Sequence, residues 1–223
     1  MFPFLITALI QIFQKDNKMA REAYPYILFF GLFLILFSAL GMYLAAGLLF
    51  LLILFITYFF RDPERTVPSE NNVVVAPADG RVTKVERLDG ASSDSPHLIS
   101  IFLSPLDVHI NRAPIAGRIS QVNHVKGRFV SATRADASLV NEQNVITIED
   151  GSVKVVIKQI AGLVARRCVL WKREGEQVAL GERLGLIKFS SRTDIILPTE
   201  FTPLVKTGDR VQGGVTIIGR KKR

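Results

Sequence analysis

An uncharged run near the N-terminus constrains the fold of this chain more than any other feature. Residues 23–60 form 38 consecutive positions without a charged side chain. One helix of that length would be about 57 Å long at 1.5 Å per residue, whereas a bilayer core of about 30 Å needs roughly 20 apolar residues. The run therefore predicts two membrane-spanning helices, a transmembrane helical hairpin, with its turn near Gly41–Tyr43.

Positive charges flank this run on both sides: Lys15, Lys18 and Arg21 before it, Arg61 and Arg65 after it. This arrangement favours a hairpin with both ends in the cytoplasm. A cleaved signal peptide would have a shorter apolar region ending in small residues, and this run ends in aromatic side chains. The apolar stretch at residues 1–13 is compatible with either spanning the membrane or inserting into its surface, and the sequence leaves that choice open.

The rest of the composition excludes several classes of protein. Of the net charge of +8, +7 belongs to residues 61–223, and a basic domain beside a membrane is attracted to anionic headgroups. No helix-turn-helix, zinc-finger or aromatic RNA-binding pattern occurs, so we expect no nucleic-acid partner. The single cysteine, Cys168, cannot form an internal disulfide and fits a reducing compartment. Three widely spaced histidines offer no recognisable zinc site, so we expect no metal.

Residues 61–223 contain short β-branched runs separated by Gly, Pro, Asp or Asn: residues 73–75, 81–85, 97–103, 145–148, 153–160 and 177–180. This spacing predicts a mainly β domain, a compact sandwich or barrel, and not alternating βαβ units. We therefore expect a membrane anchor at 1–60 and a separate β-rich domain at 61–223. Two segments, 76–82 and 205–211, place Asp and Gly at turns. Such pairs also occur in lipoyl-type or biotinyl-type carriers, but the modifiable Lys triplet of a carrier is missing.

Five segments carry a resemblance to a known family. They read FFRDPER at 59–65 with PADGRV at 77–82, LSPLDVHINRAP at 103–114, NEQN at 141–144, QIAGLVARR at 159–167, and FSSR at 189–192. In this order they resemble the short bacterial and archaeal form of the phosphatidylserine decarboxylases. The last segment falls where that family has its maturation motif, Phe-Gly-Ser-Arg. The resemblance covers nearly all of residues 59–215.

The resemblance implies a chain that cuts itself and carries its own cofactor. The Ser191 hydroxyl would attack the carbonyl of Ser190, the amide would become an ester, and elimination would release a β chain, 1–190, and an α chain, 191–223. Pyruvate, as a covalent pyruvoyl group derived from Ser191, would cap the α chain in an α/β heterodimer. It would form a Schiff base with a serine phospholipid and act as an electron sink for loss of CO2. The implied reaction converts phosphatidylserine to phosphatidylethanolamine on the cytoplasmic side of the cell membrane.

The maturation segment departs from the family pattern in one residue. Ser190 stands where the family has glycine, which tolerates strained backbone geometry that other residues resist, so slower cleavage is expected. Alignment on Phe189 and Arg192 selects Ser191 as the reacting serine. A relative that is stalled by Ser190 and never processed is an alternative interpretation.

Asp79 and His109 are the candidates for acid–base chemistry. Asp79 matches the family aspartate associated with processing, and its other interpretation is an Asx-turn before Gly80. His109 matches the first histidine of the long-form motif, and a ring that titrates near neutral pH suits a base or an acid. The long form has a second histidine where this chain has Arg112, so its processing triad does not carry over intact. His97 and His124 are assigned structural roles.

Three arginines, Arg112, Arg166 and Arg167, are candidates for holding the substrate phosphate, because a guanidinium fork suits phosphate oxygens. Solvated or ion-paired roles are the alternative. The sequence does not distinguish diacyl from archaeal ether lipids. A non-enzymatic, membrane-anchored β module also fits the anchor and the strand pattern, although such a module would have no reason to cut its own backbone.

Overall fold

The computed structural model describes residues 17–88, 95–132, 134, 136–162, 167–188 and 191–222. The chain divides into two compact units, Met1–Glu64 and Arg65–Arg223. We describe each unit by itself.

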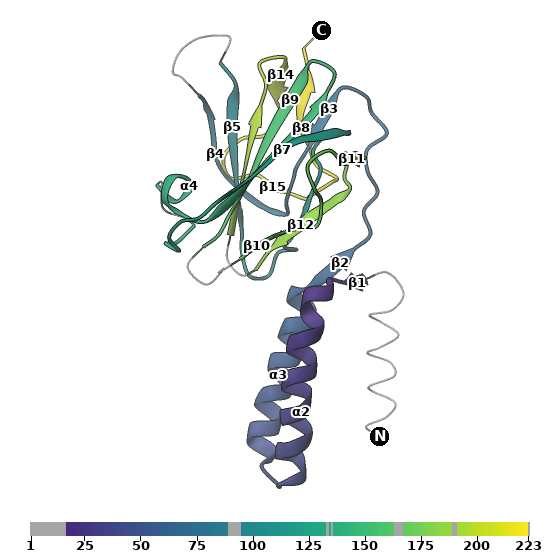
Figure 1. Cartoon of the computed structure of the whole chain (residues 1–223), viewed down its shortest axis with the longest axis vertical. Coiled ribbons are helices and arrows are strands. Elements are labelled where there is room, and N and C mark those ends of the chain that lie inside the picture. The colour runs from purple at the N-terminus through teal and green to yellow at the C-terminus, as the bar shows by residue number, and fades with distance from the viewer. Residues whose placement is uncertain are drawn as a thin grey trace. The chain divides into compact units, whose positions relative to one another are not determined.

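The first unit is a helical hairpin. A 3-10 turn η1 (Arg21–Ala23) leads into helix α2 (Tyr24–Ala39), and helix α3 (Tyr43–Phe59) returns beside it (Figure 1). Short strands β1 (Asn17–Met19) and β2 (Arg61–Pro63) pair antiparallel and join the two ends of the hairpin. Gly41 turns the chain with a φ of 74°, a left-handed conformation that glycine adopts without a steric penalty. The helical hairpin and the position of its turn are as the sequence predicts.

The surface of this hairpin is apolar. The segment Arg21–Ala39 is long and apolar enough to cross a membrane, and Tyr43–Phe59 is a shorter apolar helix. Large side chains such as Leu28, Leu32 and Leu44 are more than two-thirds exposed. Contiguous exposed apolar surface of this extent is unusual for a protein in water and is typical of a membrane contact.

The second unit is mainly β, as the sequence predicts. Its strands are β3 (Val73–Val75), β4 (Gly80–Arg87), β5 (His97–Leu103), β6 (Ile110–Arg112), β7 (Gly117–Val125), β8 (Gln143–Asp150), β9 (Val153–Ile160), β10 (Cys168–Leu170), β11 (Gln177–Val178), β12 (Arg183–Ile187), β13 (Ser191–Leu197), β14 (Phe201–Pro203), β15 (Arg210–Val211) and β16 (Ile217–Lys221). One short helix, α4 (Ala137–Val140), interrupts them.

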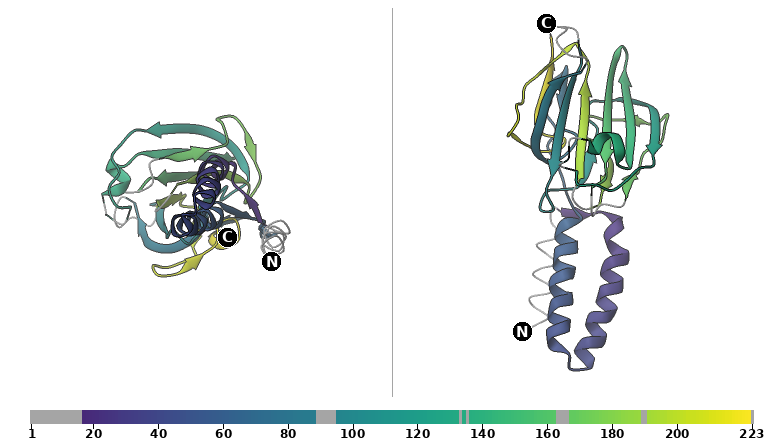
Figure 2. Two further views of the ribbon diagram at one scale, coloured as in Figure 1. Left: turned by 90° about the horizontal axis from the view of Figure 1, so that it is seen from below. Right: turned by 90° about the vertical axis from the view of Figure 1, so that its left-hand side faces the viewer.

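Most of these strands form one curled sheet of eight strands, in the order β11-β7-β8-β9-β13-β5-β4-β15 (Figures 1 and 2). Strand β13, which begins at Ser191, lies between β5 and β9 and pairs antiparallel with both. It therefore occupies the interior of the sheet, although the sequence places it near the end of the chain.

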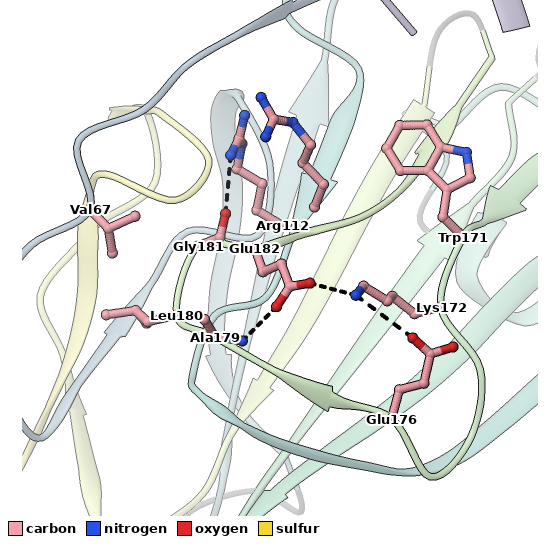
Figure 3. A pocket seen from close by; sticks show the side chains of 10 residues that line it. Val67, Arg112, Trp171, Lys172, Glu176, Ala179, Leu180, Gly181 and Glu182 are labelled. Atoms are coloured by element: carbon pink, nitrogen blue, oxygen red, sulfur yellow. Dashed lines mark hydrogen bonds and ion pairs between the residues drawn. The ribbon is translucent and has the colours of Figure 1, made fainter. Parts of the chain in front are cut away.

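Two three-stranded sheets complete the unit, β10-β12-β6 and β14-β16-β3. A pocket of about 620 Å³ opens beside β6 and β12, and Lys172 forms ion pairs with Glu176 and Glu182 in its wall (Figure 3).

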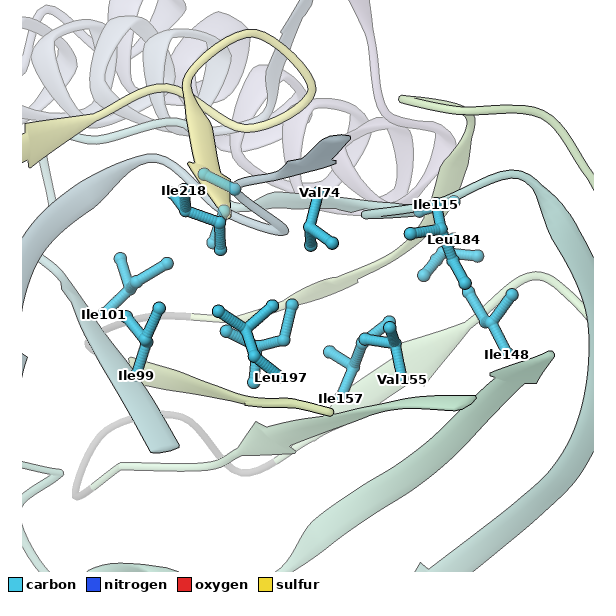
Figure 4. Packing of buried hydrophobic residues seen from close by; sticks show 14 of the residues in the cluster. Val74, Ile99, Ile101, Ile115, Ile148, Val155, Ile157, Leu184, Leu197 and Ile218 are labelled. Atoms are coloured by element: carbon cyan, nitrogen blue, oxygen red, sulfur yellow. The ribbon is translucent and has the colours of Figure 1, made fainter. Parts of the chain in front are cut away.

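The hydrophobic core fills the space between the large sheet and the two small ones (Figure 4). Ile99, Ile157 and Leu197 point inward from the large sheet and meet Val74 and Ile218 from β3 and β16. Burying one such aliphatic side chain contributes about 1.5–3 kcal/mol. This packing fixes the position of β13, and with it the position of Ser191.

Candidate active site

Ser191 is the first residue of β13 and is fully buried. It pairs with Leu103 at the end of β5. Within the described part of the chain, the Ser191 Oγ has no hydrogen-bond partner. A buried hydroxyl without a partner is energetically costly, and such a group is a candidate for chemistry. Ser190, the other predicted residue of the cleavage site, lies outside the described residues.

His109 is buried close to the same end of the sheet. Its Nδ1 lies 2.9 Å from the carbonyl oxygen of Asp107, and because a carbonyl only accepts, Nδ1 carries the hydrogen. In the neutral ring Nε2 then has the lone pair. The main-chain N–H of Ile187 donates to the carbonyl oxygen of His109 at 3.3 Å, which brings His109 beside the chain segment that leads to Ser191.

A second contact ties the strand after His109 to the strand of Ser191. The Nδ2 of Asn111, on β6, donates to the Oγ1 of Thr193, on β13, at 3.0 Å. Side chains two residues apart on a strand share one face. Ser191 and Thr193 therefore share one face of β13, and Asn111, two residues after His109, contacts this face.

Asp79 lies in the turn before Gly80, at the same end of the large sheet. Gly80 has a φ of 150°, and a Cβ there would lie 2.2 Å from the carbonyl oxygen of Phe102, so only glycine fits. The Asp79 carboxylate accepts hydrogen bonds from Arg65 Nη2 at 2.7 Å and from the Gly213 N–H at 2.8 Å. Burial raises the pKa of Asp79 above its usual value and outweighs the opposing effects of Arg65 and Gly213.

Asp107 shares a pocket of about 410 Å³ with Asp79 and Arg210. Its carboxylate accepts from the Ser104 N–H at 2.8 Å and from Arg210 Nη1 at 2.7 Å. Burial alone would raise the pKa of Asp107, but these hydrogen bonds outweigh burial and hold the pKa below its usual value. Asp107 is not among the site residues predicted from the sequence, although the Ser-Pro-Leu-Asp turn typical of such a bond is visible in LSPLDVHINRAP.

The three arginines are placed differently. Arg112 is buried, its Nη1 donates to the carbonyl oxygen of Gly181 at 3.1 Å, and it lines the pocket beside β6 and β12 (Figure 3). Arg167 is exposed, and its carbonyl oxygen accepts from the Lys188 N–H, three residues before Ser191. Arg166 lies outside the described residues. The structure therefore brings Ser191, His109 and Asp79 to one end of the sheet, with Arg167 beside the segment that leads to Ser191, whereas Arg112 lines a separate pocket.

Two buried polar features were not predicted. Arg192 forms a two-fold hydrogen-bonded ion pair with Asp194, at 2.8 Å for each bond, next to Ser191 on β13. Gln159 and Asn144 are buried on neighbouring strands and bond to each other at 3.0 Å. The signal for the second feature is Gln159 at the end of the otherwise apolar and basic run VKVVIKQI.

Comparisons with known proteins agree with this site. The family model described as phosphatidylserine decarboxylase matches residues 52–219. A phosphatidylserine decarboxylase proenzyme from Solibacter usitatus is 46% identical over 198 residues, which cover 87% of this chain and 94% of the relative. Proteins of the same name from Carboxydothermus hydrogenoformans and Magnetococcus marinus are 41% and 40% identical, over 92% and 94% of this chain and 97% and 98% of their own. The chain belongs to the phosphatidylserine decarboxylase family.

Proposed function

We propose that this chain is a membrane-anchored proenzyme that cuts itself between Ser190 and Ser191 and then decarboxylates phosphatidylserine to phosphatidylethanolamine. The relatives named above are proenzymes of that activity. The observation that carries the proposal is the buried hydroxyl of Ser191, which has no hydrogen-bond partner among the described residues, at the strand end where His109 is brought close.

The residues around Ser191 fit a pyruvoyl group formed from it. The hydroxyl is the nucleophile that self-cleavage requires, and burial excludes water that would compete with it. Once formed, the pyruvoyl carbonyl supplies an electron sink for loss of CO2 from an amino acid headgroup.

His109 is the base that we assign to Ser191. Its Nδ1–H is held on the Asp107 carbonyl, so the neutral ring presents the Nε2 lone pair for the hydroxyl proton of Ser191. After decarboxylation the same nitrogen can return a proton, since a group that accepts a proton in one step can donate it in the next.

Asp79 and Asp107 have different tasks in this proposal. Asp107 stays ionised and fixes the turn that holds His109. Asp79, with its raised pKa, retains a proton at higher pH than an ordinary aspartate and is the second candidate for proton transfer.

The two products are expected to stay together as an α/β heterodimer. Residues 191–223 include β13, in the interior of the large sheet, β15, which pairs with β4, and β16, which pairs with β3. Cutting one peptide bond removes none of these pairings.

Membrane attachment and phosphate binding complete the proposal. The segment Arg21–Ala39 is long and apolar enough to span a bilayer, and the basic residues that flank the hairpin favour a catalytic unit on the cytoplasmic side. Of the three candidate arginines for the substrate phosphate, Arg167 has the best support, because it is exposed and its backbone bonds to Lys188 near Ser191. Arg112 and Arg166 remain candidates.

The test is release of CO2 from vesicles that contain phosphatidylserine labelled at the headgroup carboxyl. We expect the wild-type protein to release labelled CO2 and Ser191→Ala to release none. The control contains phosphatidylcholine vesicles and free serine labelled at the carboxyl. The absence of labelled CO2 from this control excludes a route in which serine is first hydrolysed from the lipid and then decarboxylated as the free amino acid. A wild-type protein that releases no CO2 from phosphatidylserine would refute the proposed reaction.

A further inference from the structure

A chain of side-chain amides runs from the surface to the strand of Ser191. His124 Nδ1 bonds to Asn144 Oδ1 at 2.8 Å, and Asn144 Nδ2 donates to Gln159 Oε1 at 3.0 Å. Gln159 Nε2 donates to Asn111 Oδ1 at 2.8 Å, and Asn111 Nδ2 donates to Thr193 Oγ1 at 3.0 Å. His124 is exposed, whereas the four other members are buried.

The direction of this chain is fixed by two backbone carbonyls. The Nδ2 of Asn144 also donates to the carbonyl oxygen of Cys168 at 3.3 Å. The Nδ2 of Asn111 likewise contacts the carbonyl oxygen of Pro77 at 3.4 Å. A carbonyl accepts hydrogen bonds only, so turning either amide around would set oxygen against oxygen. Asn111 therefore holds its NH2 end, not its carbonyl end, toward β13.

This NH2 end has a donor to spare. Asn111 Nδ2 carries two hydrogens, of which one makes the 3.0 Å bond to Thr193. The other meets the Pro77 carbonyl only at 3.4 Å, and that carbonyl already accepts the main-chain N–H of Arg112 at 2.9 Å. A hydrogen bond of that length is weak, so a stronger acceptor close by would take this hydrogen.

We propose that Asn111 is a further catalytic residue, whose Nδ2–H donates to an oxygen of the group that reacts at Ser191. Gln159 and Asn144 act as positioning residues that hold the Asn111 amide in this orientation. Ser191 lies two residues from Thr193 on the same face of β13, about 7 Å along the strand, a gap that a carbonyl or carboxylate bound there can bridge. A donor aimed at a developing negative charge in a buried site lowers the barrier substantially. The inference rests on the proposed self-cleavage.

The decisive variant is Asn111→Asp, which keeps the shape but replaces the NH2 donor with an acceptor. Self-cleavage is followed by pulse-chase during cell-free synthesis of the full chain with phospholipid vesicles. At pH 8 we expect a loss of about 100-fold, the typical effect of removing one such donor. The matched control is Asn141→Asp. Asn141 is an equally buried amide, but it donates to the carbonyls of Val130 and Ala161, which are not part of the hydrogen-bonded series of amides. It is expected to cleave at the wild-type rate.

A second pair tests the positioning residue. Gln159→Glu leaves an acceptor for Asn144 but removes the donor to Asn111, so the Asn111 amide is expected to turn its carbonyl toward β13, with the same loss of cleavage. Its control is Gln143→Glu, the same change at a buried glutamine on β8 that donates to the Ser138 carbonyl.

The pH dependence separates loss of the donor from loss of packing. Protonation gives each introduced carboxyl an O–H that can donate again. The cleavage rate of Asn111→Asp and of Gln159→Glu, divided by that of the wild type, is therefore expected to rise as the pH falls, and to stay flat for both controls. Dividing by the wild-type rate removes the pH effects that variant and wild type share through the ionisable side chains near these amides, which include His109, His124 and Cys168.

Each outcome decides a different point. An uncut wild type would refute the proposed function. A cut wild type with Asn111→Asp cleaving like Asn141→Asp would refute the inference alone. If Asn111→Asp does not fold, the Gln159→Glu variant decides the question, and cleavage of Gln159→Glu at the wild-type rate would refute the inference about Asn111. Thr193→Val removes the resting partner of Asn111 but leaves the donor, so it is expected to cleave normally; slow cleavage would mean that Asn111 only ties the two strands together.

Discussion

At the scale of single residues, two aspartates in one pocket have pKa values that move in opposite directions. Burial raises the pKa of Asp79, whereas hydrogen bonds from Ser104 and Arg210 lower that of Asp107 despite burial. Carboxyl groups whose environments separate their pKa values are typical of acid–base sites. Here the ionised member, Asp107, also supplies the carbonyl that orients His109.

Replacing His109 by Gln is expected to slow self-cleavage by about 10²–10⁴-fold, the usual contribution of a general base. The matched control is His97→Gln, because His97 pairs with Leu197 at the opposite end of β5 and β13. Pulse-chase labelling gives both rates. Equal rates for the two variants would exclude His109 as the base.

Asp107 also predicts how stability depends on pH. Its pKa in the folded state lies below the model-compound value of 3.8. The stabilisation is therefore present above pH 3.8 and is lost as the pH falls through the lower, folded-state pKa. Asp107→Asn is expected to reduce the free energy of unfolding by about 1–2 kcal/mol at pH 7 and by much less near pH 2.5. Denaturant titrations of the Ser191→Ala background at both pH values measure this, and a deficit that grows at acid pH would contradict it.

At the scale of elements, β13 connects the chemistry to the stability of the fold. Ser191 begins this strand, Ile195 is fully buried in the core, and Ile196 is only half-buried on the other face. The same seven residues that begin with Ser191 also fill the middle of the large sheet.

Ile195→Ala is expected to lower the free energy of unfolding by about 2–4 kcal/mol, because it leaves a cavity in a packed core. Ile196→Ala, the matched change on the half-buried face, should cost clearly less. In the cleaved protein, both variants should lower the denaturant concentration at which residues 191–223 separate from the rest. Ile195→Ala should lower this concentration more than Ile196→Ala does. Size-exclusion chromatography in rising urea follows this separation, and equal effects of both variants would show that β13 is not held by its inward face.

The strands themselves could be predicted from the sequence, because β-branched runs between turn residues are a local signal. The order of strands could not, since β13 pairs with β5, whose residues lie about 90 positions earlier in the sequence. The family resemblance identified Ser191, His109 and Asp79. A serine pair or a single histidine, taken by itself, would not have marked these residues as candidates. Asp107 and the amide chain through Asn111 were missed because their role depends on contacts between distant strands, such as Asn111 with Thr193.

At the scale of the whole molecule, one chain combines an apolar hairpin with a β unit that contains the buried Ser191. A lipid substrate does not leave the membrane readily, so an anchored enzyme meets it without extracting it first. The net charge of +8 adds attraction to anionic headgroups. The assembly is expected to be made as one inactive chain and to become active by breaking one of its own peptide bonds.

Intact-mass spectrometry of the purified protein tests the expected self-cleavage. We expect the wild type to give a fragment of residues 1–190 and a 33-residue fragment, 191–223, the latter without a free amino terminus and reactive toward ketone reagents. Ser191→Ala is expected to remain a single chain of 24.8 kDa. A wild-type protein that also remains intact at 24.8 kDa would contradict the account.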